Sequence, residues 1–303
     1  MSNENIRLIK RFTSPLRSIL RGGDEDMTGE EILSLVAEYG PKNLLASEKK
    51  FDGSGDPEEV HSYTYDEKGN LIEHVMEMPM DGILERFVTT RNAEGHPITI
   101  VKFYGDDAGE KVEYVFATHG QPVSVVRHDA DGEFESKEEL TYNDQHLLVQ
   151  KLVTDAAGVT RKYTFAYNDK NLMAKEEELD GNDKLVSRLE YTYNEDGKET
   201  SLLKFNEENK PVSSVKSEYD ENGRLARRVS KGFYTRISLY EYDEEGRLLE
   251  ESLSDENGFV ISRNRMEYNE SGLVTHETVY ETDLTRAGRD THLAHRFEYE
   301  FFS

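Results

Sequence analysis

A nine-residue phrase recurs along this chain and limits its fold more than any other feature. In its clearest copies it reads Tyr-x-Tyr-Asp-x-x-Gly-x-Leu, as in "YTYDEKGNL" from Tyr63 and "YEYDEEGRL" from Tyr240. The tyrosine before the Asp or Asn recurs from Tyr142 to Tyr268 at steps of 25, 26, 26, 23 and 26 residues. Such spacing is typical of folds in which one supersecondary unit is repeated and packs on its neighbours.

The copies are numerous enough to fill most of the chain. Further copies are "LTYNDQHLL", "FAYNDKNLM", "YTYNEDGKE", "SEYDENGRL" and "MEYNESGLV", which begin at Leu140, Phe165, Tyr191, Ser217 and Met266. Two worn copies, "TTRNAEGHPI" and "YVFATHGQPV", occupy the interval between Tyr65 and Tyr142. About nine units therefore cover residues 60–303.

Each unit contains two turn signals. One follows the tyrosine, as in Asp220 to Gly223, and the other stands farther on, as in Asp255 to Gly258. An opening Asp or Asn and a closing Gly favour a type I turn followed by a left-handed residue, which is a common hairpin loop. The residues between turns alternate in polarity, which predicts half-buried strands. The fold class is therefore mainly β, a repeat-built antiparallel β-meander of about 18 strands.

A meander of this size cannot stay flat. At ~4.8 Å per strand, about 18 strands would span on the order of 85 Å, whereas twisted sheets rarely exceed ~10 strands without curling. The face that carries Tyr, Phe, Leu and Val must also be shielded from water. We therefore expect the sheet to curl into a spiral or a large barrel-like sheet, with its glutamates and lysines outside.

The phrase "Y-x-Y-D-E-x-G-R-L" at residues 240–248, with relatives at 217–225 and 63–71, resembles the YD repeats of Rhs and teneurin-type proteins. The resemblance covers about four fifths of the chain. It implies a spiralling β-shell, which in that family is implicated in enclosing a toxin cargo or in cell-surface adhesion. The unit here is longer than the family's, and we expect no toxin-like domain after the repeats. The likeness therefore supports the meander more than any cargo.

Residues 6–22, "IRLIKRFTSPLRSILRG", break the repeat pattern. Apolar and basic side chains fall on opposite arcs of a helical wheel, which predicts a basic amphipathic segment of short helices, interrupted near Pro15. Three roles stay open: the segment caps its own acidic sheet or an edge strand, which we favour, docks in a partner's groove, or lies on a membrane surface. The candidate contact residues are Ile6, Arg7, Ile9, Lys10, Arg11, Phe12, Leu16, Arg17 and Leu20.

A second helix is predicted directly after an acidic linker. Thr28 and Glu31 form a capping-box signature, and Gly40 with Pro41 marks the end of the helix. The predicted organisation is a basic amphipathic segment at 1–22, an acidic linker and short capped helix at 23–41, and a β-hairpin repeat domain at 42–303.

Residues 222–240, "NGRLARRVSKGFYTRISLY", hold five basic residues and no acidic one. They belong to the shortest unit, in which the second turn is tightened to Lys231-Gly232. One interpretation is a site for an anion or an acidic partner. The other, which we favour, is a set of ion pairs with glutamates of neighbouring hairpins. The candidate partner-binding residues are Arg224, Arg227, Arg228, Lys231 and Arg236.

The chain carries 62 acidic against 37 basic residues, a net charge of -25. This field repels phosphate backbones and anionic lipid, so we expect a protein partner, with a basic one favoured, and neither nucleic acid nor membrane contact. Self-association stays open. The absence of cysteine excludes disulfides, thiol nucleophiles and cysteine-bound metals. With no membrane span and no signal peptide, the expected location is the cytoplasm, and leaderless export stays open.

The sequence offers little for catalysis or metal binding. His292 and His295 could hold a metal on a helix, but two ligands lack a third, and we favour a solvated loop before the final strand "RFEYEFF". In "HDADGEF" at 128–134, Arg127 stands where an EF-hand loop needs its first ligand. No nucleophile elbow, P-loop or dinucleotide fingerprint occurs. We expect no catalytic residue, cofactor or metal, and no enzyme.

These observations predict a non-enzymatic β-repeat scaffold or binding protein that acts through protein–protein contacts, with the N-terminal amphipathic helix as a docking or capping element. A second hypothesis is an acidic inhibitor, immunity protein or chaperone that masks a basic toxin or effector. A third is a carbohydrate-binding module, because 17 tyrosines offer stacking surfaces. Affinity that falls steeply with salt would indicate the second, and salt-independent glycan binding the third.

Overall fold

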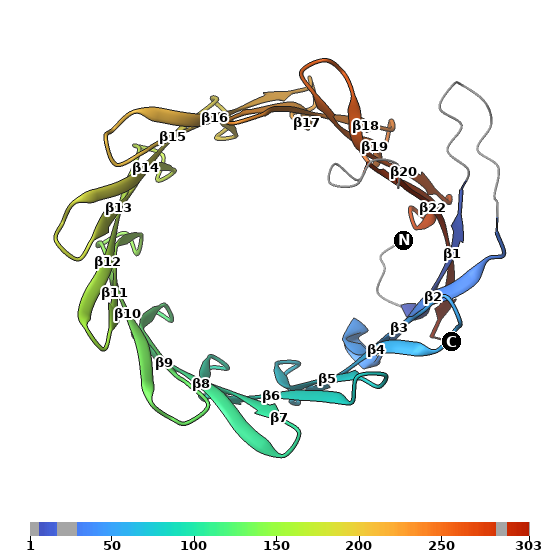
Figure 1. Cartoon of the computed structure of the whole chain (residues 1–303), viewed down its shortest axis with the longest axis horizontal. Helices are drawn as coiled ribbons and strands as arrows, with labels where there is room; N and C mark the ends of the chain where they lie inside the picture. Colours follow the sequence, from blue (N-terminus) through green and yellow to red (C-terminus); the bar gives the residue numbers. More distant parts are fainter. Residues whose placement is uncertain (1–5, 17–28, 283–289, 303) are drawn as a thin grey trace. The chain divides into compact units, whose positions relative to one another are not determined.

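The computed structural model describes residues 6–16, 29–282 and 290–302, and nearly all of them form antiparallel β-strands (Figure 1). These ranges contain 22 strands rather than the predicted number of about 18, because the segments before the repeats are strands too. Within the same ranges, the sole helical element is a 3-10 turn, η2 (Pro41–Asn43). No helix in the described part of the chain is long and apolar enough to cross a membrane.

Short turns separate the strands throughout the described ranges. The strands are β1 (Ile6–Pro15), β2 (Ile32–Tyr39), β3 (Leu45–Phe51), β4 (Pro57–Tyr65), β5 (Leu71–Met78), β6 (Ile83–Arg91), β7 (Pro97–Tyr104), β8 (Asp107–Phe116), β9 (Pro122–His128), β10 (Phe134–Tyr142), β11 (Leu148–Asp155), β12 (Gly158–Tyr167), β13 (Met173–Asp180), β14 (Leu185–Tyr193), β15 (Glu199–Phe205), β16 (Pro211–Tyr219), β17 (Leu225–Lys231), β18 (Thr235–Tyr242), β19 (Leu248–Asp255), β20 (Val260–Tyr268), β21 (Val274–Glu281) and β22 (Thr291–Phe301).

The strands divide between two compact units, each of them a curved antiparallel sheet (Figure 1). Unit 2 comprises Glu85–Glu218 and Arg228–Thr235, and strands β6 to β16 pair there in chain order. Unit 1 comprises the described residues of Met1–Leu84, Tyr219–Arg227 and Arg236–Ser303. In unit 1, β1 pairs with β2 on one side and with β22 on the other, and β22 pairs with β21. The first and last strands of the chain therefore belong to the same sheet. The predicted antiparallel meander and its curvature are confirmed in each unit.

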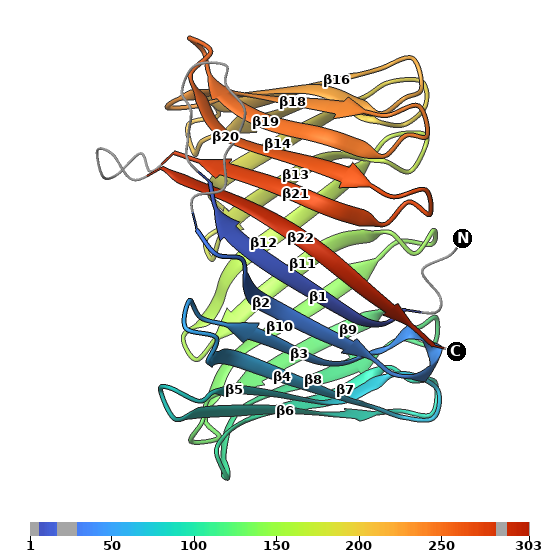
Figure 2. The same cartoon turned by 90° about the vertical axis from the view of Figure 1, so that its right-hand side faces the viewer.

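The turns have the geometry that the sequence predicts. After Tyr65, the carbonyl of Asp66 accepts a hydrogen bond from the Gly69 N–H at 3.0 Å, and Gly69 has a φ of 88°. Asp66 Oδ1 also accepts the N–H groups of Lys68 and Asn70 at 2.9 and 2.8 Å. Asp or Asn opens the turn because its side chain can accept both bonds. We call the turns after the tyrosine position proximal and the others distal. The two kinds lie at opposite ends of the strands (Figure 2).

Several tyrosines near the ends of strands tie one hairpin to the previous one. In β14 the Tyr193 hydroxyl donates a hydrogen bond to the carbonyl of Met173, the first residue of β13, at 2.7 Å. Because β13 starts directly after the preceding proximal turn, this bond joins successive proximal hairpins. The same bond, at 2.8 to 3.0 Å, recurs from Tyr65 to Leu45, Tyr142 to Pro122, Tyr167 to Leu148, Tyr242 to Leu225, Tyr268 to Leu248 and Tyr299 to Val274.

An arginine directly after the turn glycine strengthens the same link. Arg247 Nε donates to Asp243 Oδ2 of its own turn at 2.5 Å. Its Nη1 donates to the carbonyl of Asn269 in the next proximal turn at 3.4 Å. The guanidinium also lies over the ring of Tyr268, 4.9 Å from the centroid, which is a cation–π contact. One side chain therefore contacts its own turn, the next turn and the next tyrosine.

Where the structure describes the helical segments predicted before the repeats, at Ile6–Pro15 and Ile32–Tyr39, they are strands, so the prediction is wrong there; residues 17–28 lie outside the description. β1 pairs with β2 on one side, where Lys10 lies opposite Val36, and with β22 on the other. Pairing on both sides satisfies the backbone groups of this 10-residue segment, and that outweighs its helical periodicity. Glu31 does not cap a helix, because its carboxylate accepts the Nε and Nη2 of Arg296 at 2.9 and 2.7 Å. Thr28 lies outside the described residues.

The tyrosine face is more polar than predicted. Alternation along β4 puts Glu59 on this face, where it pairs with Lys50 of β3 at 2.8 Å. On the same face of β12, Arg161 pairs with Glu178 of β13 at 3.0 Å. The expectation that glutamates and lysines lie away from the tyrosines is therefore wrong for these pairs. Among the described residues no large side chain is fully buried, so this face is not a dry core, and its paired charges keep contact with water.

Removing the hydroxyl of a proximal tyrosine should destabilise the chain. Tyr193→Phe keeps the ring but leaves the Met173 carbonyl without its donor, so we expect the free energy of unfolding to fall by about 1 kcal/mol. Tyr191→Phe is the matched control, because Tyr191 stands two residues earlier in β14 and its hydroxyl bonds to none of the described residues. Urea unfolding measures both, and equal midpoints for the two variants would contradict the assigned role.

The left-handed turn position should tolerate only glycine or a residue such as asparagine at low cost. Gly258 has a φ of 85°, and a Cβ added there meets nothing within 4 Å. Gly258→Ala therefore measures the cost of the left-handed backbone alone, and we expect the free energy of unfolding to fall by about 1–2 kcal/mol. Gly53 has equal open space without a left-handed φ. Gly53→Ala should therefore leave the melting temperature nearly unchanged. A similar loss in both variants would argue against the turn assignment.

Candidate functional site

β1 carries the N-terminal candidates into the sheet of unit 1. Ile6 and Leu8 are only 5% and 7% exposed. Arg7 forms an ion pair with Glu300 of β22, and Lys10 Nζ lies 3.4 Å from the second oxygen of the same carboxylate. These are contacts of a strand that completes its own sheet. A role of the same residues in binding a partner stays a prediction.

Other residues of this segment also contact their own chain. Ile9 lies opposite Ala37 of β2. The guanidinium of Arg296 lies 4.3 Å from the ring centroid of Phe12, and the N–H of Leu16 donates to a carbonyl of β22 at 2.9 Å. The candidates that lie outside the described residues are Arg17 and Leu20.

A buried polar cluster lies where β1 meets β22. Thr13 Oγ1 donates to Ser34 Oγ at 2.7 Å and lies 2.8 Å from His295 Nδ1. Ser34 in turn donates to the carbonyl of Arg11 at 3.1 Å. Both hydroxyl protons are therefore used elsewhere, and neither is given to the imidazole, as a nucleophile–base pair would require. The cluster supports the junction of the two strands.

The same cluster shifts two pKa values. Burial lowers the pKa of His295 to about 4, and the charge of Arg11 acts in the same direction. Glu277 lies opposite His295 on β21, and burial raises the pKa of its carboxyl, against the opposing effect of Arg11. His295 is consequently neutral at neutral pH, and its Nδ1 lies within hydrogen-bond distance of the Thr13 hydroxyl.

His295 should make the chain sensitive to acid. Its folded pKa of about 4 lies below the ordinary 6.5, so the unfolded chain takes up a proton first as the pH falls. The contribution of neutral His295 to the free energy of unfolding is on the order of 3 kcal/mol. It is complete above pH 6.5 and is lost as the pH falls towards 4. His295→Asn should flatten this part of the stability–pH curve in urea unfolding. The exposed His276→Asn serves as the control, and parallel curves for both variants would disprove the assignment.

The five basic candidates of residues 222–240 are divided between the units. Arg224, in unit 1, donates to Asp220 Oδ2 at 2.7 Å and to the carbonyl of Asp243 at 3.1 Å. Arg228, in unit 2, lies 3.7 Å from Glu199. The contact of Arg228 agrees with the ion pairs to neighbouring glutamates that the sequence favoured, whereas Arg224 pairs with an aspartate of its own turn. The remaining candidates are Arg227 and Arg236 in unit 1 and Lys231 in unit 2.

The distal turn between β17 and β18 ends in two exposed aromatic side chains. Phe233 is 92% exposed and Tyr234 64%, and their rings meet edge to face with centroids 4.8 Å apart. The Gly232 N–H donates to the carbonyl of Tyr234 at 3.2 Å. Neither aromatic residue was among the candidates above, although the missing turn Asp in the shortest unit was a signal. We call Lys231 to Tyr234 the aromatic tip.

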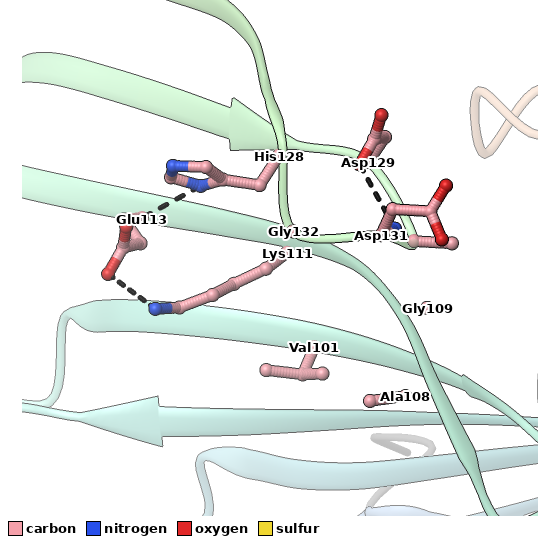
Figure 3. A pocket seen from close by; sticks show the side chains of 10 residues that line it. Val101, Ala108, Gly109, Lys111, Glu113, His128, Asp129, Asp131 and Gly132 are labelled. Carbon is pink, nitrogen blue, oxygen red and sulfur yellow. Dashed lines mark hydrogen bonds and ion pairs between the residues drawn. The ribbon is translucent and has the colours of Figure 1, made fainter.

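A hollow of about 390 Å³ lies in unit 2 beside the distal turn that joins β9 and β10 (Figure 3). Val101 of β7 and Ala108 of β8 form part of its apolar wall. Gly109 lies next to them, and a Cβ there would meet the ring of Tyr104 at 2.7 Å, so a glycine is needed at this point of close packing. We call this feature the acidic hollow, because of the charged residues described next.

Carboxylates border the apolar wall. Glu113 pairs with Lys111 at 2.7 Å and lies 3.6 Å from His128 Nδ1, and Figure 3 shows these three side chains facing one another. Asp129 Oδ1 accepts the N–H of Asp131 at 3.0 Å, as an opening turn residue does, and Asp131 is exposed. The hollow thus offers an apolar surface with acidic groups around it.

The histidines do not assemble a metal site. His292 and His295 lie in β22, so the predicted solvated loop is wrong at these positions, and residues 283–289 lie outside the description. Residues three apart on a strand point to opposite faces, so these two cannot share an ion. His61 and His74 are brought together by strand register, with Nδ1 of one 2.8 Å from Nε2 of the other. Within the described ranges no three His, Asp or Glu residues are placed to hold a metal.

No protein-family model matches the chain, and neither does any curated protein. Several solved structures are similar to it. A crystal structure of TcdB2-TccC3-Cdc42 has 14% identity and a TM-score of 0.43, over 93% of this chain and 19% of that one. A Tc holotoxin pore of Photorhabdus luminescens has 12% identity and a TM-score of 0.34, over 97% and 22%.

A porin-like protein from Bacteroides uniformis has 12% identity and a TM-score of 0.32, over 97% of this chain and 98% of that one. The chain spans about a fifth of the length of the Tc toxin chains that it matches.

Proposed function

We propose that the chain is a non-enzymatic, YD-repeat-like β-scaffold that acts through protein–protein contacts made by its turns. The observation that carries this proposal is the aromatic tip, where Phe233 is 92% and Tyr234 64% exposed. Large aromatic side chains are the residues that most often dominate binding energy in protein interfaces. Leaving two of them in water at the end of a hairpin is unfavourable unless they are covered part of the time.

The location of the aromatic tip supports a scaffold role. Strands paired on both sides fix the sheet, whereas a turn can change its residues without disturbing the ladder. Several other distal turns keep the Asp-x-x-Gly chemistry, as at Asp129 to Gly132 and Asp255 to Gly258. The tip has the sequence Lys231-Gly232-Phe233-Tyr234 instead. It lacks the opening Asp or Asn that stabilises a turn, and it adds two exposed aromatic side chains.

A second candidate function is the masking of a basic toxin or effector by an acidic protein. The net charge of -25 favours it, because a strongly negative surface attracts a basic partner and speeds its association. The two functions differ in where the partner binds. A masking protein would use dispersed carboxylates and lose affinity steeply with salt, whereas a scaffold would depend on the aromatic tip.

Capture of partners from native lysate tests the proposal. The variant Phe233→Ser/Tyr234→Ser should retain a specific partner about tenfold less than the unaltered chain, because both anchors are lost. Phe259→Ser is the matched control, since Phe259 is 53% exposed on a distal turn of unit 1. Quantitative mass spectrometry of the retained proteins measures the difference. A partner retained equally by both variants and released by salt would replace the scaffold with the masking protein.

A further inference from the structure

We infer that the aromatic tip docks into the acidic hollow of a second copy of this chain. The inference rests on the proposed function, because it names the partner of the same tip. Both surfaces lie in unit 2, so each copy carries one tip and one hollow. The contact therefore needs no other molecule.

The tip is basic and apolar in a chain that is otherwise acidic. The part of residues 222–240 that lies in unit 2, Arg228–Thr235, contains two basic residues and no acidic one, within a chain of net charge -25. Lys231 is exposed and is separated from Phe233 only by Gly232, and Arg228, which lies 3.7 Å from Glu199, precedes it on β17 with a side chain 44% exposed. A surface that receives this tip must combine an apolar cleft with negative charge.

The acidic hollow has both properties. Its volume of about 390 Å³ exceeds the ~150 Å³ of a cavity that accepts benzene, so the open hollow is large enough for an aromatic ring. Val101 and Ala108 would contact the ring, and the exposed Asp131 at its border would face the lysine of the tip (Figure 3). Of the other two acids, Glu113 already pairs with Lys111, and Asp129 Oδ1 accepts the N–H groups of Asp131 and Glu133, which leaves Asp131 as the group best placed for an incoming cation.

The tip cannot reach the hollow of its own copy. Lys231 and Val212 of β16 line the same small depression, which places the tip beside β16. The acidic hollow lies at β8 and β9, seven strands away along the meander, which at ~4.8 Å per strand is on the order of 30 Å. The occupant must come from another molecule.

The contact joins two different surfaces, so it is heterologous and can extend into rings or open chains. Four tip residues bury less than the ~1,200 Å² of a standard interface, so a weak contact is expected, with a Kd in the range of ~10–500 µM. Repulsion between two acidic chains opposes it at long range and is screened by salt, whereas the apolar part of the contact is not. Association should therefore be strongest at intermediate salt.

Sedimentation velocity of the purified chain tests this directly, from about 1 µM to about 1 mM protein. The unaltered chain should associate with rising concentration. The tip variant, Phe233→Ser/Tyr234→Ser, and the hollow variant, Ala130→Lys/Asp131→Lys, should each stay monomeric, with a Kd raised at least about tenfold. Both sets of substitutions are in exposed turns, and urea unfolding verifies that each variant folds.

Mixing the two variants gives the decisive result. The tip variant keeps an intact hollow and the hollow variant keeps an intact tip, so an equal mixture should form one-to-one dimers that grow no further. Two matched controls should associate as the unaltered chain does. They are Phe259→Ser, an exposed aromatic on another distal turn, and Glu207→Lys/Glu208→Lys, which changes the corresponding two positions of the β15–β16 turn.

Three results would overturn the inference: a monomeric unaltered chain at every concentration, association that either variant leaves unchanged, or a mixture that stays monomeric. Binding to phosphatidylserine vesicles that requires the tip, without self-association, would instead assign the tip to lipid. The scaffold proposal fails separately. If the chain stays monomeric while tip-dependent capture from lysate persists, the scaffold stands with another partner; if both are absent, both fail.

Discussion

The hydrogen bond from a tyrosine hydroxyl to a carbonyl of the preceding proximal hairpin is the interaction on which the architecture depends. A single hairpin cannot cover its own aromatic face, so each unit needs a neighbour. The ring supplies contact area, and the hydroxyl, as in Tyr193 to Met173 at 2.7 Å, fixes where the neighbour sits. An arginine such as Arg247 adds a second link across the same step.

This way of building a sheet leaves charge on both faces. Ion pairs such as Lys50 with Glu59 stand among the tyrosines and stay partly hydrated, so each contributes little to stability. The tyrosine links and the ladder of paired strands fix the sheet, and the exposed middle residues of the turns can vary. The departure at Phe233 and Tyr234 is therefore informative, because nothing in the repeat requires two aromatic residues there. It is also why we place the function at a turn.

The repeat phrase was sufficient to predict the meander, its two turns per unit and the left-handed glycine, because those features depend on residues close in sequence. The repeat phrase was not sufficient to predict β1 as a strand. β1 pairs with β2 and with β22, and β22 lies almost 300 residues away in the sequence. Helical periodicity at Ile6, Ile9 and Phe12 was a local signal that long-range pairing outweighed. The meeting of His61 with His74 and the acidic hollow likewise depend on strand register, which no single segment encodes.

Spectrophotometric titration of the tyrosines would test the central claim most directly. Burial raises the pKa of the proximal tyrosines above the ordinary 10, including Tyr167, Tyr193 and Tyr268. A hydroxyl that donates to a carbonyl also resists losing its proton. We predict a distinct group of tyrosines that ionise above 10, together with loss of the β-sheet signal in circular dichroism. Ionisation of all 17 tyrosines near 10 with the sheet intact would contradict the account.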